Sequence, residues 1–136
     1  MGYDLRDHTA DVAVEATGTS LGDAFSAAAD GMAAAMCEEW PPGGDRVEIS
    51  VTAESRDALL FDYLDELIYE RDVRSVLPVD NEGTVEQVDD QFRFSGSFRG
   101  VALSAVSARD LKAVTYSEMS IAETDDGWRI YVVFDV

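Results

Sequence analysis

The sequence contains one lysine, one histidine and one cysteine among its 136 residues. The lone Cys37 cannot form a disulfide within the chain, and no cysteine or histidine has a partner at the spacing of a zinc site. Because Cys37 follows apolar helix positions in AAAMCEEW, we expect a packed core thiol rather than a nucleophile. The composition therefore excludes disulfide scaffolds and zinc modules.

Long apolar runs are missing as well. No run approaches the roughly 18 residues that a membrane-spanning helix needs, and MGYDLRDH lacks the apolar core of a signal peptide. The glycines form neither a G-x-G-x-x-G pattern nor a P-loop, so no phosphate-binding loop is recognisable. We therefore predict a cytoplasmic protein that does not contact membranes.

Positive charge is scarce, because 10 basic residues face 28 acidic ones and the formal net charge is -18. Such a chain repels phosphate backbones, which excludes a broad electrostatic grip on nucleic acid. The acidity fits either a face for a basic partner or metal, or a halophile-type surface. In molar salt the Debye length falls to about 3 Å and self-repulsion is screened. We favour salt adaptation, because arginine replaces lysine and the carboxylates are spread along the whole chain.

Hydrophobic periodicity predicts two helices, residues 19–40 with Ser20 as N-cap and residues 55–73 with Ser55 as N-cap. Alternation predicts strands over the ranges 3–8, 12–18, 46–54, 76–90, 91–107, 111–124 and 127–136. The DDG stretch at 125–127 predicts a hairpin between the last two strands.

The order of these elements predicts an α+β fold. Two helices cover one face of a mainly antiparallel or mixed sheet, as in an α/β sandwich. The length and the 46% hydrophobic content fit one domain spanning residues 1–136.

The segment Asp7-His8-Thr9-Ala10-Asp11 places the only histidine between two aspartates at an expected turn. Carboxylates suit calcium, magnesium or manganese, and a neutral imidazole can join them for a transition metal. Alternatively, the aspartates cap the turn and His8 forms a local hydrogen bond. The segment alone favours the turn interpretation.

The other end of the sequence adds negative groups. An apolar strand runs to Phe134, and Asp135 and the terminal carboxylate of Val136 follow it, with no tail expected. If the last strand lies beside the first, Asp11, Asp135 and the Val136 carboxylate converge. Like charges at close range raise one another's pKa, and a divalent cation would neutralise them. An ordinary strand end is the alternative, and the spacing does not decide between the two.

Two more charged residues are candidates. Glu66 lies four residues after Asp62 on one helix face and could point into the same site, although a solvated acidic face is the alternative. Lys112 could reach a phosphate or a partner carboxylate, or it is simply a surface residue.

Four stretches in order, DHTADVAVEA, LLFDYLDELIYERD, LKAVTY and VVFDV, together resemble the archease family. The resemblance implies a small cytoplasmic α/β sandwich that assists the GTP-dependent RtcB-type RNA ligase, which joins tRNA halves during splicing. It implies a protein cofactor rather than an enzyme. Such a cofactor promotes ligase guanylylation and multiple turnover, and contacts RNA only through the ligase.

The resemblance also assigns residues. It implies a metal site formed by Asp11, Asp135 and the terminal carboxylate of Val136, with calcium ranked before magnesium and manganese. It makes Glu66 a further candidate ligand. It places candidates for the ligase-facing surface at Asp7, His8 and Lys112.

The sequence departs from the family pattern at two positions. Ser117 stands where a histidine is expected after AVTY, and Asp65 stands where an asparagine is expected before Glu66. Any role of that histidine is in doubt for this chain, whereas the expected fold and carboxylate site are unaffected.

Two other functions compete. A stand-alone metal-dependent phosphoester hydrolase would use His8 as general base and would turn over substrate without a partner. A chaperone-like adaptor would offer an apolar helix surface and would be insensitive to chelators. The hydrolase ranks low because the sequence has no second histidine and no basic cluster at the site.

Overall fold

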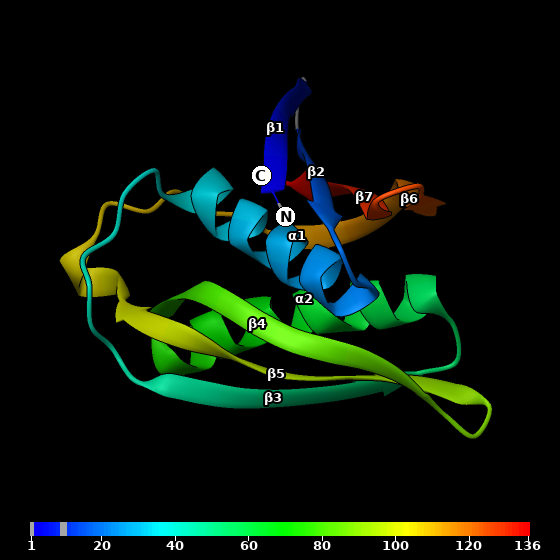
Figure 1. Cartoon of the computed structure of the whole chain (residues 1–136). Coiled ribbons are helices and arrows are strands. Elements are labelled where there is room, and N and C mark those ends of the chain that lie inside the picture. The colour runs from blue at the N-terminus through cyan, green and yellow to red at the C-terminus, as the bar shows by residue number, and fades with distance from the viewer. Residues whose placement is uncertain (1, 9–10) are drawn as a thin grey trace.

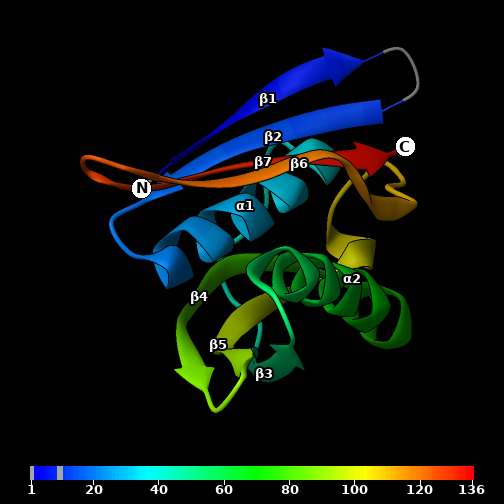
Figure 2. The ribbon, with the colours of Figure 1, turned by 90° about the vertical axis from the view of Figure 1, so that its right-hand side faces the viewer.

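The computed structural model of the chain describes residues 2–8 and 11–136. Two helices lie between two antiparallel sheets (Figures 1 and 2). The elements follow in the order β1 (Gly2–His8), β2 (Asp11–Gly18), α1 (Leu21–Met36), β3 (Arg46–Ala53), α2 (Arg56–Arg74), β4 (Val76–Val88), β5 (Gln91–Ala102), a 3₁₀ turn (Leu103–Ala105), β6 (Ala113–Thr124) and β7 (Gly127–Asp135).

The predicted α+β class is confirmed, and the strands divide into two sheets rather than one. The first sheet has the order β1-β2-β7-β6, and the second has the order β3-β5-β4. The first and last strands of the chain therefore share a sheet, while the strands between them form the other. The alternation of apolar and polar residues along a strand indicates which of its faces is buried, but it does not indicate which strand pairs with it.

Helix α1 is buried on nearly all sides because it contacts both sheets. Its alanines and glycines allow this close approach. A Cβ added at Gly22 would lie 2.5 Å from the Gly83 carbonyl oxygen of β4, and one added at Gly31 would lie 2.5 Å from Val14 of β2. The predicted cap is confirmed, since Ser20 Oγ accepts the Asp23 N–H at 3.1 Å.

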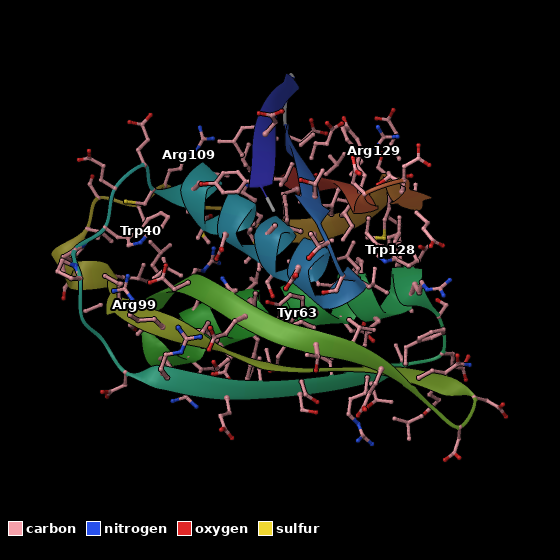
Figure 3. All side chains as sticks on the ribbon, in the orientation of Figure 1. Trp40, Tyr63, Arg99, Arg109, Trp128 and Arg129 are labelled. Atoms are coloured by element: carbon pink, nitrogen blue, oxygen red, sulfur yellow. The ribbon has the colours of Figure 1, made fainter. Side chains whose placement is uncertain are left out.

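Helix α2 is amphipathic and begins at its predicted cap, where Ser55 Oγ accepts the Ala58 N–H at 3.1 Å. Its first residue, Arg56, lies over the rings of Phe92 (5.2 Å) and Trp128 (5.3 Å), one from each sheet. Its inward face consists of Leu59, Leu60, Tyr63, Leu64, Leu67 and Ile68. Among these residues of α2, Tyr63 is fully buried and lies beside β4 (Figure 3).

The segment before β6 differs from its prediction. Strand β5 ends at Ala102, and β6 begins at Ala113, so Lys112 lies outside the strand. The prediction that Lys112 lies within a strand is therefore wrong. The buried guanidinium of Arg71 donates to the Leu111 carbonyl at 2.8 Å. The carbonyl of Leu111 therefore bonds a side chain of α2 and not a neighbouring strand. Cys37 is buried as predicted, and its thiol donates to the Glu39 carbonyl.

A buried polar link joins α1 to β4. Asp30 Oδ1 accepts the Asn81 backbone N–H and the Asn81 side-chain amide, both at 2.9 Å. The Tyr63 hydroxyl donates to Asn81 Oδ1 at 3.4 Å. Burial is the main cause that raises the pKa of the Asp30 carboxyl above its ordinary value, and the neighbouring charge of Asp80 raises it further.

This link gives a pH-dependent stability. Because the folded pKa of Asp30 is raised, the folded protein binds the proton more tightly than the unfolded chain does. The free energy of unfolding of the parent should therefore fall, relative to Asp30→Asn, as the pH rises from 3.8 through the raised folded pKa. Urea titrations between about pH 3.5 and pH 7 measure this difference. A difference that stays flat with pH, or that has the opposite sign, would contradict the assignment.

Among residues 2–8 and 11–136, the structure contains no helix that is both long enough and apolar enough to cross a membrane.

Candidate functional site

The register of the first sheet brings the two predicted aspartates together. Asp11 opens β2 and pairs with Asp135, the last residue of β7. Asp135 pairs on its other side with Ala113 of β6. The end of β7 and the start of β2 therefore lie at the same end of the sheet (Figure 2). The predicted juxtaposition of Asp11 and Asp135 is confirmed at the level of the backbone.

Both aspartates lie on the face of the sheet that points away from the helices. Their neighbours Val12 and Phe134 pair across the same strands and lie in the core, and successive residues of a strand alternate between faces. Directly opposite residues of an antiparallel pair have Cβ atoms roughly 4.5–5.5 Å apart. Asp135 is exposed, whereas Asp11 is half-buried with one carboxylate oxygen screened from solvent.

Lys112 and Val136 flank this pair. The Lys112 backbone N–H donates to the Asp135 carbonyl at 2.8 Å, which ties the segment before β6 to the end of β7. The Lys112 side chain is exposed, and so is Val136. Both residues therefore lie at the predicted edge, although Lys112 is held there by its main chain.

The other two N-terminal candidates lie in β1. His8 pairs with Asp11, and Asp7 pairs with Val12, so the backbone of His8 adjoins the aspartate pair. The predicted meeting of the first two strands around His8–Asp11 is thus confirmed. Residues 9 and 10, and the side chains of Asp7 and His8, lie outside the described part of the chain.

Glu66 lies on α2 and is partly buried. Burial is the main cause that raises the pKa of the Glu66 carboxyl, and the charges of Glu70 and Asp65 on the same helix raise it further. Neither Asp11 nor Asp135 is among the groups that shift this pKa. The role of Glu66 as a further ligand stays a prediction.

Side chains alone do not form a cluster of three ligands. In the part of the chain that the structure describes, no group of three or more histidine, cysteine, aspartate and glutamate side chains could hold a metal ion. The predicted third group, the terminal carboxylate of Val136, is a main-chain group. The metal site therefore stays a prediction that rests on the aspartate pair.

The residues that fix the segment leading into β6 were not predicted from the sequence. Arg71 of α2 contacts the Leu111 carbonyl and the Met36 sulfur (3.3 Å). The Arg109 N–H donates to the Met36 carbonyl at 2.7 Å, and Arg109 Nε donates to the Ala35 carbonyl at 2.7 Å. Figure 3 shows Arg109 beside the C-terminal end of α1. One feature of the sequence could have indicated this contact. The last turn of α1 contains no basic residue, so its unpaired carbonyls need a donor from elsewhere in the chain.

A bulge in β6 was also not predicted from the sequence. Thr115 pairs with Val133, and pairing resumes only at Ser120 with Tyr131, so residues 116–119 stand opposite the single residue 132. Glu118 adopts a left-handed conformation there, with φ of 57°. The non-alternating stretch YSEM was the signal that could have indicated it.

The archease protein family matches this chain over residues 3–136. The chain belongs to the archease family. An archease from Archaeoglobus fulgidus is 34% identical over the full length of both chains. One from Methanosarcina barkeri is 30% identical and covers 98% of this chain and 95% of its own length.

Solved structures agree with the archease fold. The solution structure of protein 1598 from Methanobacterium thermoautotrophicum has a TM-score of 0.84 at 27% identity, with 99% of each chain covered. A crystal structure of an archease and possible chaperone from Thermotoga maritima has a TM-score of 0.65 at 21% identity and covers 96% of this chain and 94% of its own. The second structure supports the fold alone.

The residues at this edge are oxygen donors of the kind that a hard divalent cation prefers. Two carboxylates directly opposite each other in a strand pair repel, which destabilises the pair. A hard divalent cation prefers such oxygen ligands and would remove the repulsion. The donor set of the aspartate pair therefore fits a hard divalent cation.

Proposed function

We propose that this archease-family protein activates the GTP-dependent RtcB-type RNA ligase of tRNA splicing and is itself not an enzyme. The observation that supports the proposal is the pairing of Asp11 with Asp135, which brings both ends of the sequence to one acidic edge. The family membership supplies the partner. On this proposal the protein promotes ligase guanylylation and repeated turnover.

The proposed metal ligands are Asp11, Asp135 and the carboxylate of Val136. A bound divalent cation would supply positive charge at this edge. Asp11 is held by pairing on both sides, with β1 and with β7, so its carboxylate is presented from a fixed backbone. The Lys112 N–H fixes the Asp135 carbonyl, which keeps the second carboxylate in register.

The acidic edge would contact the mouth of the ligase active site and favour the conformation that accepts guanylate. This is a population shift in the ligase, and it requires the edge to bind that conformation more tightly than the others. RNA would be contacted only through the ligase, because a net charge of -18 repels a phosphate backbone.

Guanylylation of the purified ligase from the same organism tests the proposal. The parent protein should accelerate it, and a chelator in excess of added calcium should abolish the acceleration. Asp11→Ala and Asp135→Ala should reduce it by at least about tenfold, since even outer-shell partners of a metal cost 10–100-fold when removed.

The matched control is Asp126→Ala, which removes one carboxylate at the far end of the same hairpin, beyond the Thr124–Gly127 pair. This variant should stimulate as well as the parent. Full stimulation by Asp11→Ala and Asp135→Ala would refute the metal-dependent mechanism, and stimulation that resists the chelator would favour the adaptor. Turnover of a phosphoester by this chain alone would favour the hydrolase.

A further inference from the structure

The bulge in β6 turns one aromatic ring out of its sheet toward α2. Tyr116 is the first residue of the bulge, and its ring lies 4.3 Å from the Phe61 ring of α2 at an interplanar angle of 10°. Bulges re-aim side chains and are frequent beside functional sites. The pairing of a sheet bulge with a helix therefore fixes the position of an aromatic ring on the surface.

This ring remains largely open to solvent. Tyr116 is 54% exposed although one of its faces is stacked on Phe61. Phe61 packs on the core at its inner edge, so the stacked pair is anchored rather than freely rotating. An exposed aromatic face held in a fixed orientation binds a ligand with little loss of side-chain entropy.

Carboxylates surround the pair. Loss of solvation, followed by the negative charges of Asp62 and Asp57, raises the pKa of the Tyr116 hydroxyl above its ordinary value. The ring is neutral near pH 7, as an ordinary tyrosine is. Both aspartates are exposed on the same helix as Phe61. A neutral ring beside two carboxylates is an environment that attracts a cation.

The same pattern continues along α2. Asp65, Tyr69 and Val73 follow Phe61 at intervals of four residues, which places them on one helix face. Asp65 is exposed, Tyr69 is 58% exposed and Val73 is 61% exposed. Large exposed apolar side chains on one face mark interaction surfaces when they are contiguous. We call the surface made of Phe61, Asp62, Asp65, Tyr69 and Tyr116 the aromatic–acidic face.

We propose that the aromatic–acidic face docks an arginine-bearing segment of a basic protein partner, with one guanidinium stacked on the open side of the Tyr116 ring. Charge complementarity selects the class of partner, because nucleic acids and anionic membranes are repelled by a chain of net charge -18. Arginine fits better than lysine, since its planar guanidinium stacks on a ring and bonds a carboxylate with two N–H groups.

The chain already uses this chemistry in a contact of its own at the surface. The Arg56 guanidinium lies over two rings, Phe92 and Trp128, at 5.2 and 5.3 Å. Arg56 covers those two rings, so they do not offer a free face to an arginine of a partner. The Tyr116 ring offers a similar surface with its open side toward solvent.

The face also adjoins the aspartate edge. Strand β6 runs from Ala113, which pairs with Asp135, to Tyr116 three residues later. Asp11 and Asp135 lie on the face of the sheet that points away from the helices, whereas the Tyr116 ring points toward α2. A partner that contacts both would therefore pass around β6, which is the edge strand of this sheet. The inference rests on the proposed function where it identifies that partner as the RNA ligase.

Two binding measurements at one fixed ionic strength test the inference. The first is calorimetric titration with nona-arginine and with nona-lysine peptides. Any acidic protein attracts both peptides through its net charge, so binding by the parent protein alone does not identify a site. Tyr116→Ala leaves the net charge unchanged, so a loss of affinity isolates the ring. A cation–π contact of about 0.5–2 kcal/mol corresponds to a 2- to 30-fold weaker affinity for nona-arginine.

The expected order distinguishes the ring from its hydroxyl and from other exposed rings. Tyr116→Phe should retain the parent's affinity, and Tyr69→Ala should weaken binding in the same direction as Tyr116→Ala. Tyr3→Ala, at an exposed tyrosine of β1, should bind like the parent. Asp62→Asn should weaken binding more than Asp126→Asn, although both remove one charge. Parent-like affinity of both Tyr116→Ala and Tyr69→Ala, or equal affinity for the two peptides, would overturn the inference.

The second measurement is direct binding of the same variants to the purified ligase. The inference expects the same order of affinities, and a Tyr116→Ala protein that binds the ligase as tightly as the parent would overturn it for this partner. A parent protein that binds no ligase would refute the proposed function instead. In that event the peptide titration still decides whether the aromatic–acidic face recognises guanidinium groups.

Discussion

Tyr63→Ala is expected to lower the free energy of unfolding by about 3–5 kcal/mol, the usual cost of removing a large buried ring. Tyr63 is fully buried, and its ring lies 4.0 Å from Phe94 of β5 and 6.2 Å from Phe25 of α1. It therefore joins α2 to α1 and to the second sheet. Urea unfolding followed by circular dichroism at constant salt concentration measures the loss.

Tyr63→Phe is the matched control. It keeps the ring and removes only the hydroxyl, which donates to Asn81 Oδ1 at 3.4 Å. We expect a cost of about 1 kcal/mol, typical of one hydrogen bond. If the alanine and phenylalanine variants were equally destabilised, the stacked rings would not be what holds the helix layer to the second sheet.

A divalent cation is expected to stabilise the parent protein by about 2.7 kcal/mol when its concentration is a hundred times its dissociation constant. The physical reason is that the proposed ion would bind the folded state, where Asp11 and Asp135 are paired, and not the unfolded chain, where they are far apart. Thermal unfolding in calcium and in chelator, at equal ionic strength, measures this difference without any ligase.

Asp11→Asn and Asp135→Asn should lose most of this stabilisation, while Asp126→Asn at the hairpin turn should keep it. In chelator the order should reverse. There, Asp135→Asn should be more stable than the parent, because it removes one of two opposed like charges. Equal stabilisation of all the variants by calcium would indicate general screening of the acidic surface instead of a site.

Several features of the fold follow from local sequence. Ser20 and Ser55 cap the two helices as predicted, because a cap depends on residues within one turn of it. The Asp125-Asp126-Gly127 turn closes the β6–β7 hairpin for the same local reason. The convergence of Asp11 and Asp135 was predicted only on the condition that the last strand lies beside the first part of the chain, and the pairing of β2 with β7 meets that condition.

Other features depend on partners that lie far apart in the sequence. One of these features is the division of the strands into two sheets. Two others are the Arg71 bond to Leu111 and the Asp30–Asn81 link, each of which joins residues 40 or more positions apart. Each of these residues has an ordinary local context. A buried charge or amide becomes identifiable only when the group that satisfies it is known.

The sequence by itself determined the start of each helix and its N-cap, the strand alternation, the acidic character and the family, because each depends on neighbouring residues or on ordered motifs. It did not determine the end of α1, which is at Met36 and not at residue 40. The tertiary structure alone decided which strands share a sheet and that Tyr116 leaves its strand to stack on Phe61. The reason is that strand pairing and bulges are settled by contacts between distant segments, whose energies have no signature within a single strand.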